Sequence, residues 1–437
     1  MELAEGLKRR IADRTARVSV VGIGYVGLPL AVEFARAGFP VIGLDVDPEK
    51  VEQVSQGRAF IGDVEEADLA AVVAAGRLQA TTDPETLGTA DALIICVPTP
   101  FNRNKEPDLS AVLEAVEAIA RRLQPGQLIV LESSTYPGTT EEVLQPLLER
   151  GGLRAGRDFF LVYSPERVDP GNPTYRIPKI PKVVGGVDPT STALACALYD
   201  TVVVRTIPVS SPRVAEMAKL LENIYRNVNI ALVNELAMLS DRMGIDIWEV
   251  VEAAATKPFG FMSFQPGPGV GGHCLPVDPI YLSWKAKEYD FYTNFITLAA
   301  EVNANMPYFV ARKVVNTLVQ RSGQVAGAGV LVLGVTFKRD VADIRNSSAL
   351  KLLELLEGWG LRTAYHDPLI PELRLGEGAR KSEPLTAERL AAADCVVIHT
   401  DHSSYDYDWI VAHAPLVFDT RNATRAVRAG RDRIVRL

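Results

Sequence analysis

The sequence has only four cysteines among 437 residues, and no two of them form a C-x-x-C pair. This scarcity argues against a disulfide scaffold or a zinc knuckle and fits a reducing cytosol, so we expect a cytoplasmic protein. Long apolar runs are also missing, because no stretch reaches the length that spans a bilayer. The N-terminal residues lack the apolar core of a signal peptide. We therefore expect neither a membrane anchor nor secretion.

Excess positive charge is absent as well. Lys and Arg number 46 against 54 Asp and Glu, which gives a formal net charge of −8. An acidic protein has no general attraction for nucleic acid or for anionic membranes, so neither is expected as a partner. A chain of 437 residues is too long for one ordinary core, which indicates two or three domains.

Short apolar runs alternate with helical patterns in the first and last parts of the chain, which predicts parallel sheets covered on both faces. Between them, Pro212 opens a proline-free stretch to about Met243, which predicts one long helix ending at Gly244. This helix joins two domains or builds a dimer interface. A second helical stretch is expected from about Ile280 to Leu318. The expected α/β fold has two Rossmann-like doubly wound domains and a central helical domain, with bounds 1–210, 321–437 and 211–320.

The segment Gly22-Ile23-Gly24-Tyr25-Val26-Gly27 fits G-x-G-x-x-G between a strand and a helix. Gly22 permits the tight turn, Gly24 lets the backbone approach a pyrophosphate, and Gly27 allows close packing of helix on strand. Asp45 ends the next strand, about where a carboxylate meets a ribose 2′-OH. Because a carboxylate repels a 2′-phosphate, NAD is predicted rather than NADP. A glycine-rich turn without a ligand is the plain alternative.

Two later strands also end in polar segments. Val97-Pro98-Thr99-Pro100 follows one buried strand, and Glu132-Ser133-Ser134-Thr135 follows the next. Ligands of open α/β sheets bind at the carboxyl ends of the strands, so both segments are candidates for the cofactor site. Ordinary turn chemistry is an equally good explanation from position alone.

Cys274 lies in the polar, glycine-rich loop Gly271-Gly272-His273-Cys274, whereas the other three cysteines lie in apolar or alanine-rich segments. Such a loop leaves a thiol accessible and reactive. Spacing alone nevertheless favours a structural cysteine. Metal ligation is not expected here, because no second Cys or His lies at ligand spacing. The cluster His399, Asp401 and His402 also lacks a further His or Cys to complete a metal site.

Lys219, Asn223 and Asn227 recur every four residues and so share one face of the long predicted helix. A lysine near a reacting hydroxyl can move its proton, and an asparagine can donate to an oxyanion. Polar residues in line on a helix are otherwise simply solvated. The residues alone favour the solvated face.

With these residues in view, the chain resembles the UDP-sugar dehydrogenase family, the UDP-glucose and UDP-N-acetylhexosamine 6-dehydrogenases. The resemblance runs from the first strand to the last α/β domain. It implies two Rossmann-like domains joined by a helical dimerisation core, NAD as cofactor, a UDP-sugar substrate, a homodimer or higher homo-oligomer, and a role in polysaccharide biosynthesis. The motifs that carry it are GIGYVGLPLA, VPTP, ESSTYPGTT, YSPERVDPG, AEMAKLLENIYRNVNIALVNELA, GVGGHCLPVDP, LGVTFKRDVADIRNSS and FDTRN.

The resemblance also implies roles for single residues. Cys274 resembles the nucleophile that forms a thiohemiacetal and then a thioester. Lys219 and Asn223 match the pair that handles the alkoxide or oxyanion. Asp278 and Thr135 match residues that hold a water molecule.

Glu166 matches the carboxylate implicated in thioester hydrolysis. The residues expected to contact the UDP-sugar are Glu166, Arg167, Val168, Lys219, Asn223, Phe259, Gly260, Phe261, Gly271, Lys338 and Arg421. The residues expected to contact NAD are Gly22, Gly24, Tyr25, Val26, Gly27, Asp45, Pro98, Thr99, Thr135 and Arg345.

The cysteine loop departs from the glucose branch of the family. That branch has a lysine where this chain has Val277 and a serine where it has His273, and the loop resembles the N-acetylhexosamine branch instead. We therefore prefer UDP-N-acetylglucosamine as substrate, then UDP-N-acetylmannosamine and UDP-N-acetylgalactosamine, with UDP-glucose behind. The rivals from other classes are a two-electron dehydrogenase of a 3-hydroxy acid, a redox-neutral epimerase and a non-catalytic NAD-binding regulator.

Overall fold

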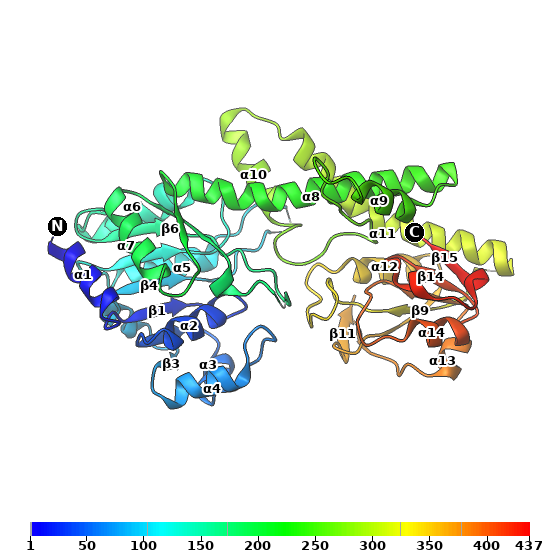
Figure 1. Ribbon diagram of the computed structural model, residues 1–437, viewed down its shortest axis with the longest axis horizontal. Helices are drawn as coiled ribbons and strands as arrows, with labels where there is room; N and C mark the ends of the chain where they lie inside the picture. The colour runs from blue at the N-terminus through cyan, green and yellow to red at the C-terminus, as the bar shows by residue number, and fades with distance from the viewer. Residues whose placement is uncertain (1, 103, 173, 324, 377) are drawn as a thin grey trace. The chain divides into compact units, whose positions relative to one another are not determined.

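The structure is a computed structural model that describes residues 2–102, 104–172, 174–323, 325–376 and 378–437. The chain divides into two compact units (Figure 1). The first comprises residues up to 222 together with 280–291, and the second comprises 223–279 together with 292–437. No helix of the described residues is long and apolar enough to cross a membrane.

The first unit is built on an eight-stranded sheet with the order β3-β2-β1-β4-β5-β6-β7-β8. Its strands are β1 (Val18–Val21), β2 (Val41–Leu44), β3 (Leu78–Thr81), β4 (Ala92–Ile95), β5 (Leu128–Leu131), β6 (Phe160–Tyr163), β7 (Lys182–Gly186) and β8 (Thr206–Pro208). Its helices are α1 (Glu2–Ala12), α2 (Gly27–Arg36), α3 (Pro48–Ser55), α4 (Glu66–Ala74), α5 (Ser110–Ala120), α6 (Gln145–Leu148) and α7 (Pro189–Tyr199).

One pair of strands departs from the expected parallel sheet. Strand β7 runs antiparallel to β6, with Tyr163 opposite Gly185. A parallel return needs a long crossover connection, usually a helix. Among the described residues of this connection, the only helical segment is the short 3-10 turn Ile177–Lys179, and the chain turns back instead. This reversal places the beginning of β7 at the carboxyl edge of the sheet, beside the end of β6.

Alternate residues of the central strands enter two separate cores. Leu128 and Val130 of β5 pack in one core, which includes residues of α2 and α7. Ile129 and Leu131 pack in the other, which includes residues of α5 and Leu148 of α6. Because both faces are covered, the strand is apolar throughout, as its sequence indicated.

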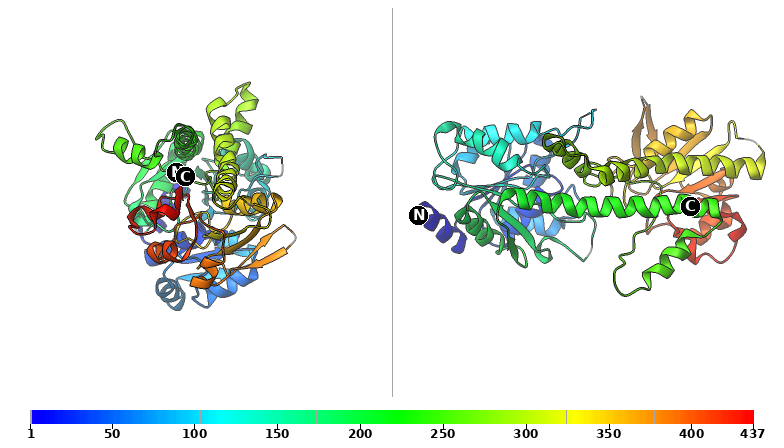
Figure 2. Two further views of the ribbon diagram at one scale, coloured as in Figure 1. Left: turned by 90° about the vertical axis from the view of Figure 1, so that its right-hand side faces the viewer. Right: turned by 90° about the horizontal axis from the view of Figure 1, so that it is seen from above.

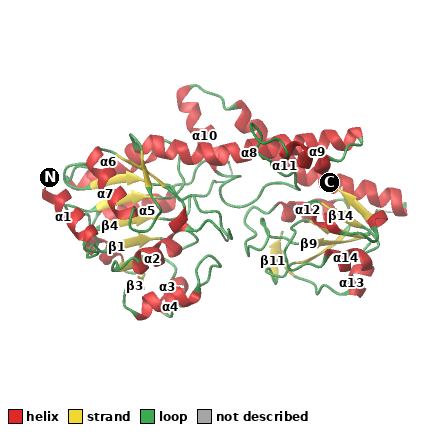
Figure 3. Ribbon diagram, in the orientation of Figure 1, coloured by secondary structure: helices red, strands yellow, loops and turns green. Residues whose placement is uncertain are grey.

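The second unit contains a five-stranded parallel sheet with the order β10-β9-β13-β14-β15. Helix α12 covers one face, and α13 and α14 cover the other (Figure 3). Its strands are β9 (Gly329–Leu333), β10 (Arg362–His366), β13 (Cys395–Ile398), β14 (Val417–Asp419) and β15 (Ile434–Arg436), with a hairpin of β11 (Glu372–Leu375) and β12 (Gly378–Lys381). Its helices are α9 (Ile247–Ala255), α11 (Asn294–Ser322), α12 (Ser348–Gly358), α13 (Ala387–Ala391) and α14 (Tyr407–His413). The predicted fold class, α/β with two Rossmann-like doubly wound sheets, is confirmed.

Helix α8 (Pro212–Met243) is one uninterrupted helix that continues from the first unit into the second (Figure 2). It begins at Pro212 and is followed by Gly244 in a left-handed conformation, as expected. The second predicted helical stretch is interrupted. It forms α10 (Asp278–Ala286) and α11, because Asp290 between them adopts a left-handed conformation with φ of 52°. No glycine or proline marks this break, which explains why periodicity missed it.

Candidate active site

The turn after β1 has the shape that its three glycines predict. Gly22 has φ of 91°, and a Cβ there would lie 3.0 Å from the Cys96 carbonyl oxygen. A Cβ on Gly27 would lie 1.9 Å from the Gly22 carbonyl oxygen, so only glycine lets α2 approach β1 this closely. A Cβ on Gly24, by contrast, would meet nothing within 4 Å. The fold therefore requires Gly22 and Gly27, whereas Gly24 leaves space for a ligand.

Asp45 stands at the end of β2 beside this turn and is 9% exposed. Its Oδ2 accepts a hydrogen bond of 3.0 Å from the Ile23 N–H, and its Oδ1 accepts one of 3.0 Å from the Asp47 N–H. These two donors fix the direction of the carboxylate. An open turn at Gly24 next to a fixed carboxylate fits an NAD dinucleotide, which would be held by these two residues and by the free N–H groups where α2 begins.

The ends of β4 and β5 supply further polar groups. The Ser133 hydroxyl donates to the Val97 carbonyl oxygen at 2.7 Å, which ties the two strand ends together. Thr99 is nearly buried, and Tyr281 donates to the carbonyl oxygen of Pro100 at 2.9 Å. Thr135 is fully buried, and its hydroxyl has no hydrogen-bond partner among the described residues. A buried hydroxyl of this kind fits a bound water molecule or a ligand atom.

Helix α8 brings Lys219 to Glu166. The Lys219 ammonium donates to the Glu166 carbonyl oxygen at 2.6 Å. Lys219 is only 8% exposed, and Asn223 and Asn227 on the same helix face are 5% and 2% exposed. The solvated-face alternative for these three residues is therefore wrong. Periodicity correctly grouped them on one face but could not tell whether that face meets water.

The cysteine loop brings three candidate residues together in the second unit. The Cys274 carbonyl oxygen accepts hydrogen bonds from the N–H groups of Val277 (3.1 Å) and Asp278 (2.8 Å), so Cys274 immediately precedes α10. The Asp278 carboxylate accepts a hydrogen bond of 2.5 Å from the Asn223 side chain. Cys274 is partly exposed, whereas Cys395 is fully buried in β13.

The two glycines before Cys274 pack against the segment after β9. A Cβ on Gly271 would lie 2.8 Å from that of Phe337, so glycine is needed for this contact. The Gly272 N–H donates to the Arg345 carbonyl oxygen at 3.0 Å, and Asn346 donates to the Gly272 carbonyl oxygen at 3.1 Å. Phe337 and Asn346 were not singled out from the sequence. Their only signal was membership in the motif LGVTFKRDVADIRNSS.

Arg421 also lies against the cysteine loop. Its Nε donates to the His399 carbonyl oxygen at 3.0 Å, and a Cβ on Gly267 would lie 2.6 Å from its guanidinium. Arg345 forms an ion pair of 2.6 Å with Asp343, and the Lys338 carbonyl oxygen accepts a hydrogen bond from Thr336.

The predicted substrate-wrapping segment, residues 259–261, is open to solvent. Phe259 is 72% exposed and Phe261 is 44% exposed. Gly260 between them has φ of 68°. Both phenylalanine side chains are therefore accessible to a ligand.

A buried row of amides holds the long loop to the helices of the second unit. Asn303 of α11 donates to the Asn227 side-chain oxygen at 2.8 Å, and Asn234 donates to the Asn303 side-chain oxygen at 2.9 Å. The Gly267 N–H donates to the Asn234 side-chain oxygen at 2.9 Å. Asn227 thus serves the support of the cysteine loop, a role that its sequence position did not suggest.

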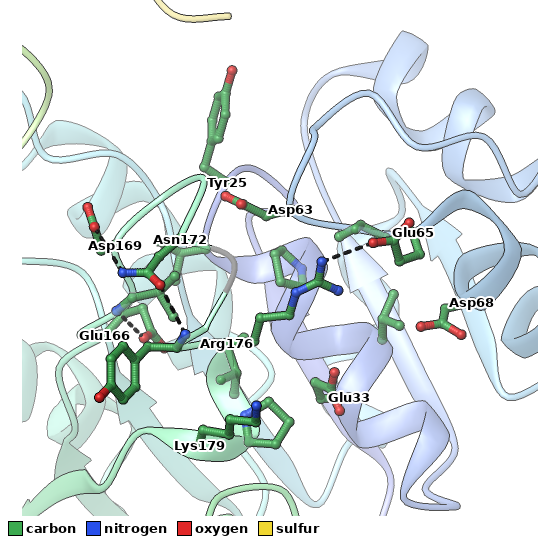
Figure 4. A pocket seen from close by; sticks show the side chains of 18 of the residues that line it. Tyr25, Glu33, Asp63, Glu65, Asp68, Glu166, Asp169, Asn172, Arg176 and Lys179 are labelled. Atoms are coloured by element: carbon green, nitrogen blue, oxygen red, sulfur yellow. Dashed lines mark hydrogen bonds and ion pairs between the residues drawn. The ribbon is translucent and has the colours of Figure 1, made fainter. Parts of the chain in front are cut away.

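A pocket of about 210 Å³ in the first unit joins the dinucleotide turn to the loop that follows β6 (Figure 4). Tyr25 and Val26 line it from the turn, and Glu166 and Val168 line it from the loop. The loop is fixed on its far side, because the Gly171 N–H donates to Asp63 and Arg176 pairs with Glu65. The structure therefore brings candidate cofactor residues and candidate substrate residues to one pocket.

The buried histidines of the second unit have partners within the protein. His399 Nε2 lies 3.0 Å from the Ser348 hydroxyl, and His402 Nε2 lies 3.2 Å from Asp367 Oδ2. Among the described residues, no group of three or more His, Cys, Asp or Glu could hold a metal ion.

Comparisons with known proteins cover almost the whole chain. Three models of the UDP-glucose/GDP-mannose dehydrogenase family match: its NAD binding domain (residues 16–203), its central domain (213–305) and its UDP binding domain (331–426). The chain is 40% identical to a UDP-N-acetyl-D-glucosamine 6-dehydrogenase of Pseudomonas aeruginosa, over 81% of this chain and 83% of that protein. It is 36% identical to an NDP-N-acetyl-D-galactosaminuronic acid dehydrogenase of Ralstonia nicotianae, over 94% and 97%. The solved UDP-D-ManNAc dehydrogenase of Pyrococcus horikoshii superposes with a TM-score of 0.86 at 33% identity, covering 96% of this chain and 98% of that one.

The open dinucleotide turn and these matches define an NAD-dependent oxidoreductase of nucleotide sugars. More particularly, the chain belongs to the UDP-glucose/GDP-mannose dehydrogenase family, with its NAD binding, central and UDP binding domains in order. The relatives are named for different N-acetylhexosamines, so family membership fixes the reaction class and leaves the sugar open.

Proposed function

We propose that the protein oxidises the C6 hydroxyl of a UDP-N-acetylhexosamine to a carboxylate, with Cys274 as the covalent nucleophile. The observation that carries the proposal is the contact chain of the cysteine loop, in which Asn223 donates to Asp278 and the Asp278 N–H donates to the Cys274 carbonyl oxygen. A thiol, an amide donor and a carboxylate held in one place suit the trapping of an aldehyde.

The reaction proceeds in three stages. The alcohol first loses a proton and a hydride and becomes an aldehyde. The Cys274 thiolate then adds to the aldehyde carbon as a thiohemiacetal, and loss of a second hydride leaves a thioester. Water finally cleaves the carbon–sulfur bond, which releases the uronate and returns the thiol. NAD, which the turn after β1 and Asp45 would hold, would supply the hydride acceptor for each oxidation.

The family resemblance suggests the roles of the other residues, and their contacts support these roles. Lys219, held in place by the Glu166 carbonyl oxygen, stabilises the alkoxide that forms when the hydroxyl loses its proton. Asn223 stabilises negative charge on the reacting oxygen, an effect worth about 3–4 kcal/mol for a well-placed donor. The unpartnered Thr135 hydroxyl and Asp278 hold the attacking water, whose proton the Glu166 carboxylate accepts.

The proposal also includes the remaining residues that the family resemblance assigns to ligand binding. Arg167, Val168, Lys338, Arg421, Gly271 and residues 259–261 bind the UDP-sugar. Pro98, Thr99 and Arg345 join the glycine turn and Asp45 in binding NAD. The three-domain division at residues 210 and 320 is supported by the three matched family ranges.

UDP-N-acetylglucosamine is the proposed substrate. The relative at 40% identity is named for this sugar, and the loop around His273 and Val277 resembles the N-acetylhexosamine branch. A second relative at 34% identity, from Salmonella typhi, carries the same name. UDP-N-acetylmannosamine and UDP-N-acetylgalactosamine follow, since other relatives are named for those series.

The test is the NADH yield per molecule of UDP-sugar, measured to completion with the N-acetylglucosamine, N-acetylmannosamine, N-acetylgalactosamine and glucose derivatives. We expect two NADH per sugar and the highest kcat/KM with UDP-N-acetylglucosamine. A yield of one NADH per sugar would instead indicate a two-electron dehydrogenase. Conversion of the sugar without net NADH would indicate an epimerase. Binding of NAD without any turnover would indicate a regulator. A higher kcat/KM for another sugar would replace the substrate and leave the reaction standing.

Cys274→Ser tests the nucleophile. We expect overall turnover to disappear while the Kd for NAD stays unchanged, because the dinucleotide turn is a separate structure. Cys196→Ser is the matched control, since Cys196 is also a partly exposed free thiol but lies on α7. Full turnover by the Cys274 variant would remove that residue from the mechanism.

A homodimer through α8 completes the proposal. The exposed apolar residues of this helix recur at helical spacing along one face. They are Val214, Met217, Leu221, Tyr225, Leu232, Leu236, Leu239 and Met243. Leu221→Glu with Leu236→Glu should give a monomer in sedimentation analysis, whereas Arg226→Glu, on another face, should not. We place this enzyme in the cytoplasm, where its four cysteines stay reduced.

A further inference from the structure

A buried charge cluster lies directly behind Glu166 in the first unit. Lys182 forms ion pairs of 3.1 Å with both Glu132 and Glu166. The side chains of Lys182 and Glu132 are 4% and 0% exposed. The buried Tyr199 hydroxyl donates to the other oxygen of Glu132. Ions this deeply buried cost stability unless paired, so the cluster calls for an explanation.

The topology explains how the cluster forms. Glu132 follows β5 and Glu166 follows β6, so both lie at the carboxyl edge of the sheet. Lys182 is the first residue of β7, and it reaches this edge only because β7 is antiparallel to β6. In the antiparallel register of β6 and β7, Tyr163 faces Gly185, and continuing this register by three residues places Lys182 opposite Glu166.

Lys182 holds Glu166 in a single arrangement. One carboxylate oxygen of Glu166 faces Lys182, and the other accepts hydrogen bonds from the N–H groups of Arg167 (2.6 Å) and Val168 (2.8 Å). The carbonyl oxygen of the same residue binds the Lys219 ammonium. A shift of Glu166 would therefore move both a carboxylate and the anchor of Lys219.

We infer that Lys182 is a positioning residue that keeps Glu166 ionised and in place for hydrolysis of the thioester, and that Glu132 is a second positioning residue, which competes with Glu166 for Lys182. The inference rests on the proposed function, in which water attacks the thioester carbon, the Glu166 carboxylate takes the water proton and the Cys274 sulfur leaves. Neither Lys182 nor Glu132 touches the reacting atoms. Their effect passes through Glu166.

The charges of the cluster support this role. Burial raises the pKa of the Glu166 carboxyl, but the Lys182 charge and the two backbone donors outweigh burial and hold that pKa below its ordinary value. Burial, with repulsion from Glu166, raises the pKa of Glu132 to about 7 despite Lys182 and Tyr199. Glu166 is therefore ionised at neutral pH, whereas Glu132 changes charge there.

The other groups facing Glu132 keep one state across this range. Burial raises the pKa of the Cys96 thiol and of the Tyr199 hydroxyl well above their ordinary values, so both stay protonated. Burial lowers the pKa of Lys182, but its two carboxylate partners outweigh burial and raise it. When Glu132 ionises, it competes with Glu166 for Lys182. Glu166 is then a stronger base than it is while Glu132 is protonated.

The experiment follows the thioester in the holoenzyme. Rapid mixing with NAD and UDP-N-acetylglucosamine, with NADH absorbance and the mass of acid-quenched protein as readouts, separates oxidation from hydrolysis. In Lys182→Met we expect a burst of two NADH per active site, a sugar adduct on Cys274, and hydrolysis slowed by about 100-fold, within the range that general-base catalysis supplies. The Kd for NAD should not change.

Three further variants control the result. Lys182→Arg keeps the charge and should restore hydrolysis to within about tenfold of the native rate. Lys8→Met removes an exposed lysine of α1, outside the pocket and the cluster, and should change neither phase. Glu132→Gln keeps the hydrogen-bonding shape without the charge, so it should abolish the rise in hydrolysis rate as pH passes through about 7.

The outcomes separate this inference from the proposed function. If the native enzyme forms no adduct and releases other than two NADH, the proposed function fails. If the native enzyme behaves as proposed but Lys182→Met hydrolyses at the native rate, or slows only in proportion to unfolding, the positioning role fails alone. Should Lys182→Met not fold, the pH profile of Glu132→Gln decides, and a profile identical to that of the native enzyme would overturn the inference.

Discussion

Gly22 follows β1 in the first α/β domain, and Gly334 follows β9 in the second, with φ of 91° and 77°. The Gly22 N–H bonds to the carbonyl oxygen that ends β2, and the Gly334 N–H bonds in the same way to His366 at the end of β10. Asp45 accepts from the N–H of Ile23, just as Asp367 accepts from that of Val335. The two domains therefore share one strand–turn–strand geometry.

The domains differ in what fills the turn. Where the first has Gly24 with open space, the second has Thr336, whose buried side chain donates to the Lys338 carbonyl oxygen. Where Asp45 has only its two backbone donors and a lysine 3.7 Å away, Asp367 also faces the ring of His402. One turn is left open for a ligand, and the other is closed by its own side chains.

This difference teaches why NAD belongs to the first domain although both have the dinucleotide fold. His402 Nδ1 accepts from the Asp340 N–H at 3.0 Å, so its proton is on Nε2, which faces Asp367. In an open site, a carboxylate at this position would accept a hydrogen bond from a ribose hydroxyl. Here the Asp367 carboxylate instead accepts one from His402. It fixes the segment that carries Lys338, a residue proposed to bind the UDP-sugar.

The largest expected effect comes from breaking the closed turn. His402→Ala removes a fully buried ring that bonds to Asp367, Thr336 and the Asp340 N–H. We expect a loss of about 3–5 kcal/mol in the free energy of unfolding, measured by denaturant titration. His413→Ala is the control, because His413 is exposed and bonds only within α14. A loss as small as in the control would mean that His402 does not hold this turn.

The open turn should respond in the opposite way. Gly24→Val fills the space that we propose for the pyrophosphate and should weaken NAD binding by about 10–100-fold, the equivalent of 1–3 kcal/mol of steric cost. The free energy of unfolding should hardly change, because nothing lies within 4 Å of the new Cβ.

Gly151→Val is the matched control for that variant, since its Cβ also meets open space but lies outside the turn. Thr336→Gly tests whether removal of this side chain opens the turn of the second domain to NAD. We expect no second NAD site in isothermal titration calorimetry. Two NAD per chain would show that the side chain of Thr336 alone had closed that turn.

Asp45→Asn tests the role of charge at the open site. Asparagine keeps an oxygen for the Ile23 N–H but loses the charge that favours a ribose hydroxyl and repels a 2′-phosphate. We expect NAD affinity to fall by about tenfold, in line with a charged hydrogen bond of roughly 1.5 kcal/mol. NADP affinity should rise toward that of NAD in competition titrations. An unchanged ratio of the two affinities would place the ribose elsewhere.

Sequence patterns predicted the open turn but not the closed one. The glycine motif with Asp45 has a recognisable spacing, because its three glycines stand within six residues and Asp45 ends the next strand. Thr336, Asp367 and His402 come from three separate strand ends, and only the folded sheet gathers them. The cluster of Glu132, Lys182 and Tyr199 was missed for the same reason, since it depends on the reversed strand β7.

Periodicity failed in a different way on the helices. It found both ends of α8 and the shared face of Lys219 and Asn223, but burial of that face depends on long-range packing. The break at Asp290 was missed because its left-handed backbone needs no glycine. Residues whose role is set by a local backbone shape were therefore predictable, and those set by partners distant in sequence were not.

The smallest expected effect is a pH dependence of the free energy of unfolding, which comes from His399 in the second α/β domain. Burial, helped by the nearby charge of Arg421, holds the pKa of His399 well below its ordinary value, so the folded ring stays neutral between Ser348 and Thr400. The unfolded chain binds a proton below about pH 6.5, and the folded chain does not. The contribution of His399 to the free energy of unfolding is therefore fully present above that pH. It declines as the pH falls, by up to about 1.4 kcal/mol per pH unit.

His399→Gln removes this titration while keeping a hydrogen-bonding group of similar length. The stability advantage of the native protein over this variant should shrink by about 1 kcal/mol between pH 7 and 5.5, as measured by denaturant unfolding at each pH. His413→Gln, at an exposed position, should leave the native pH dependence unchanged. A constant difference between native protein and His399→Gln would mean that the buried ring takes up a proton in the folded state.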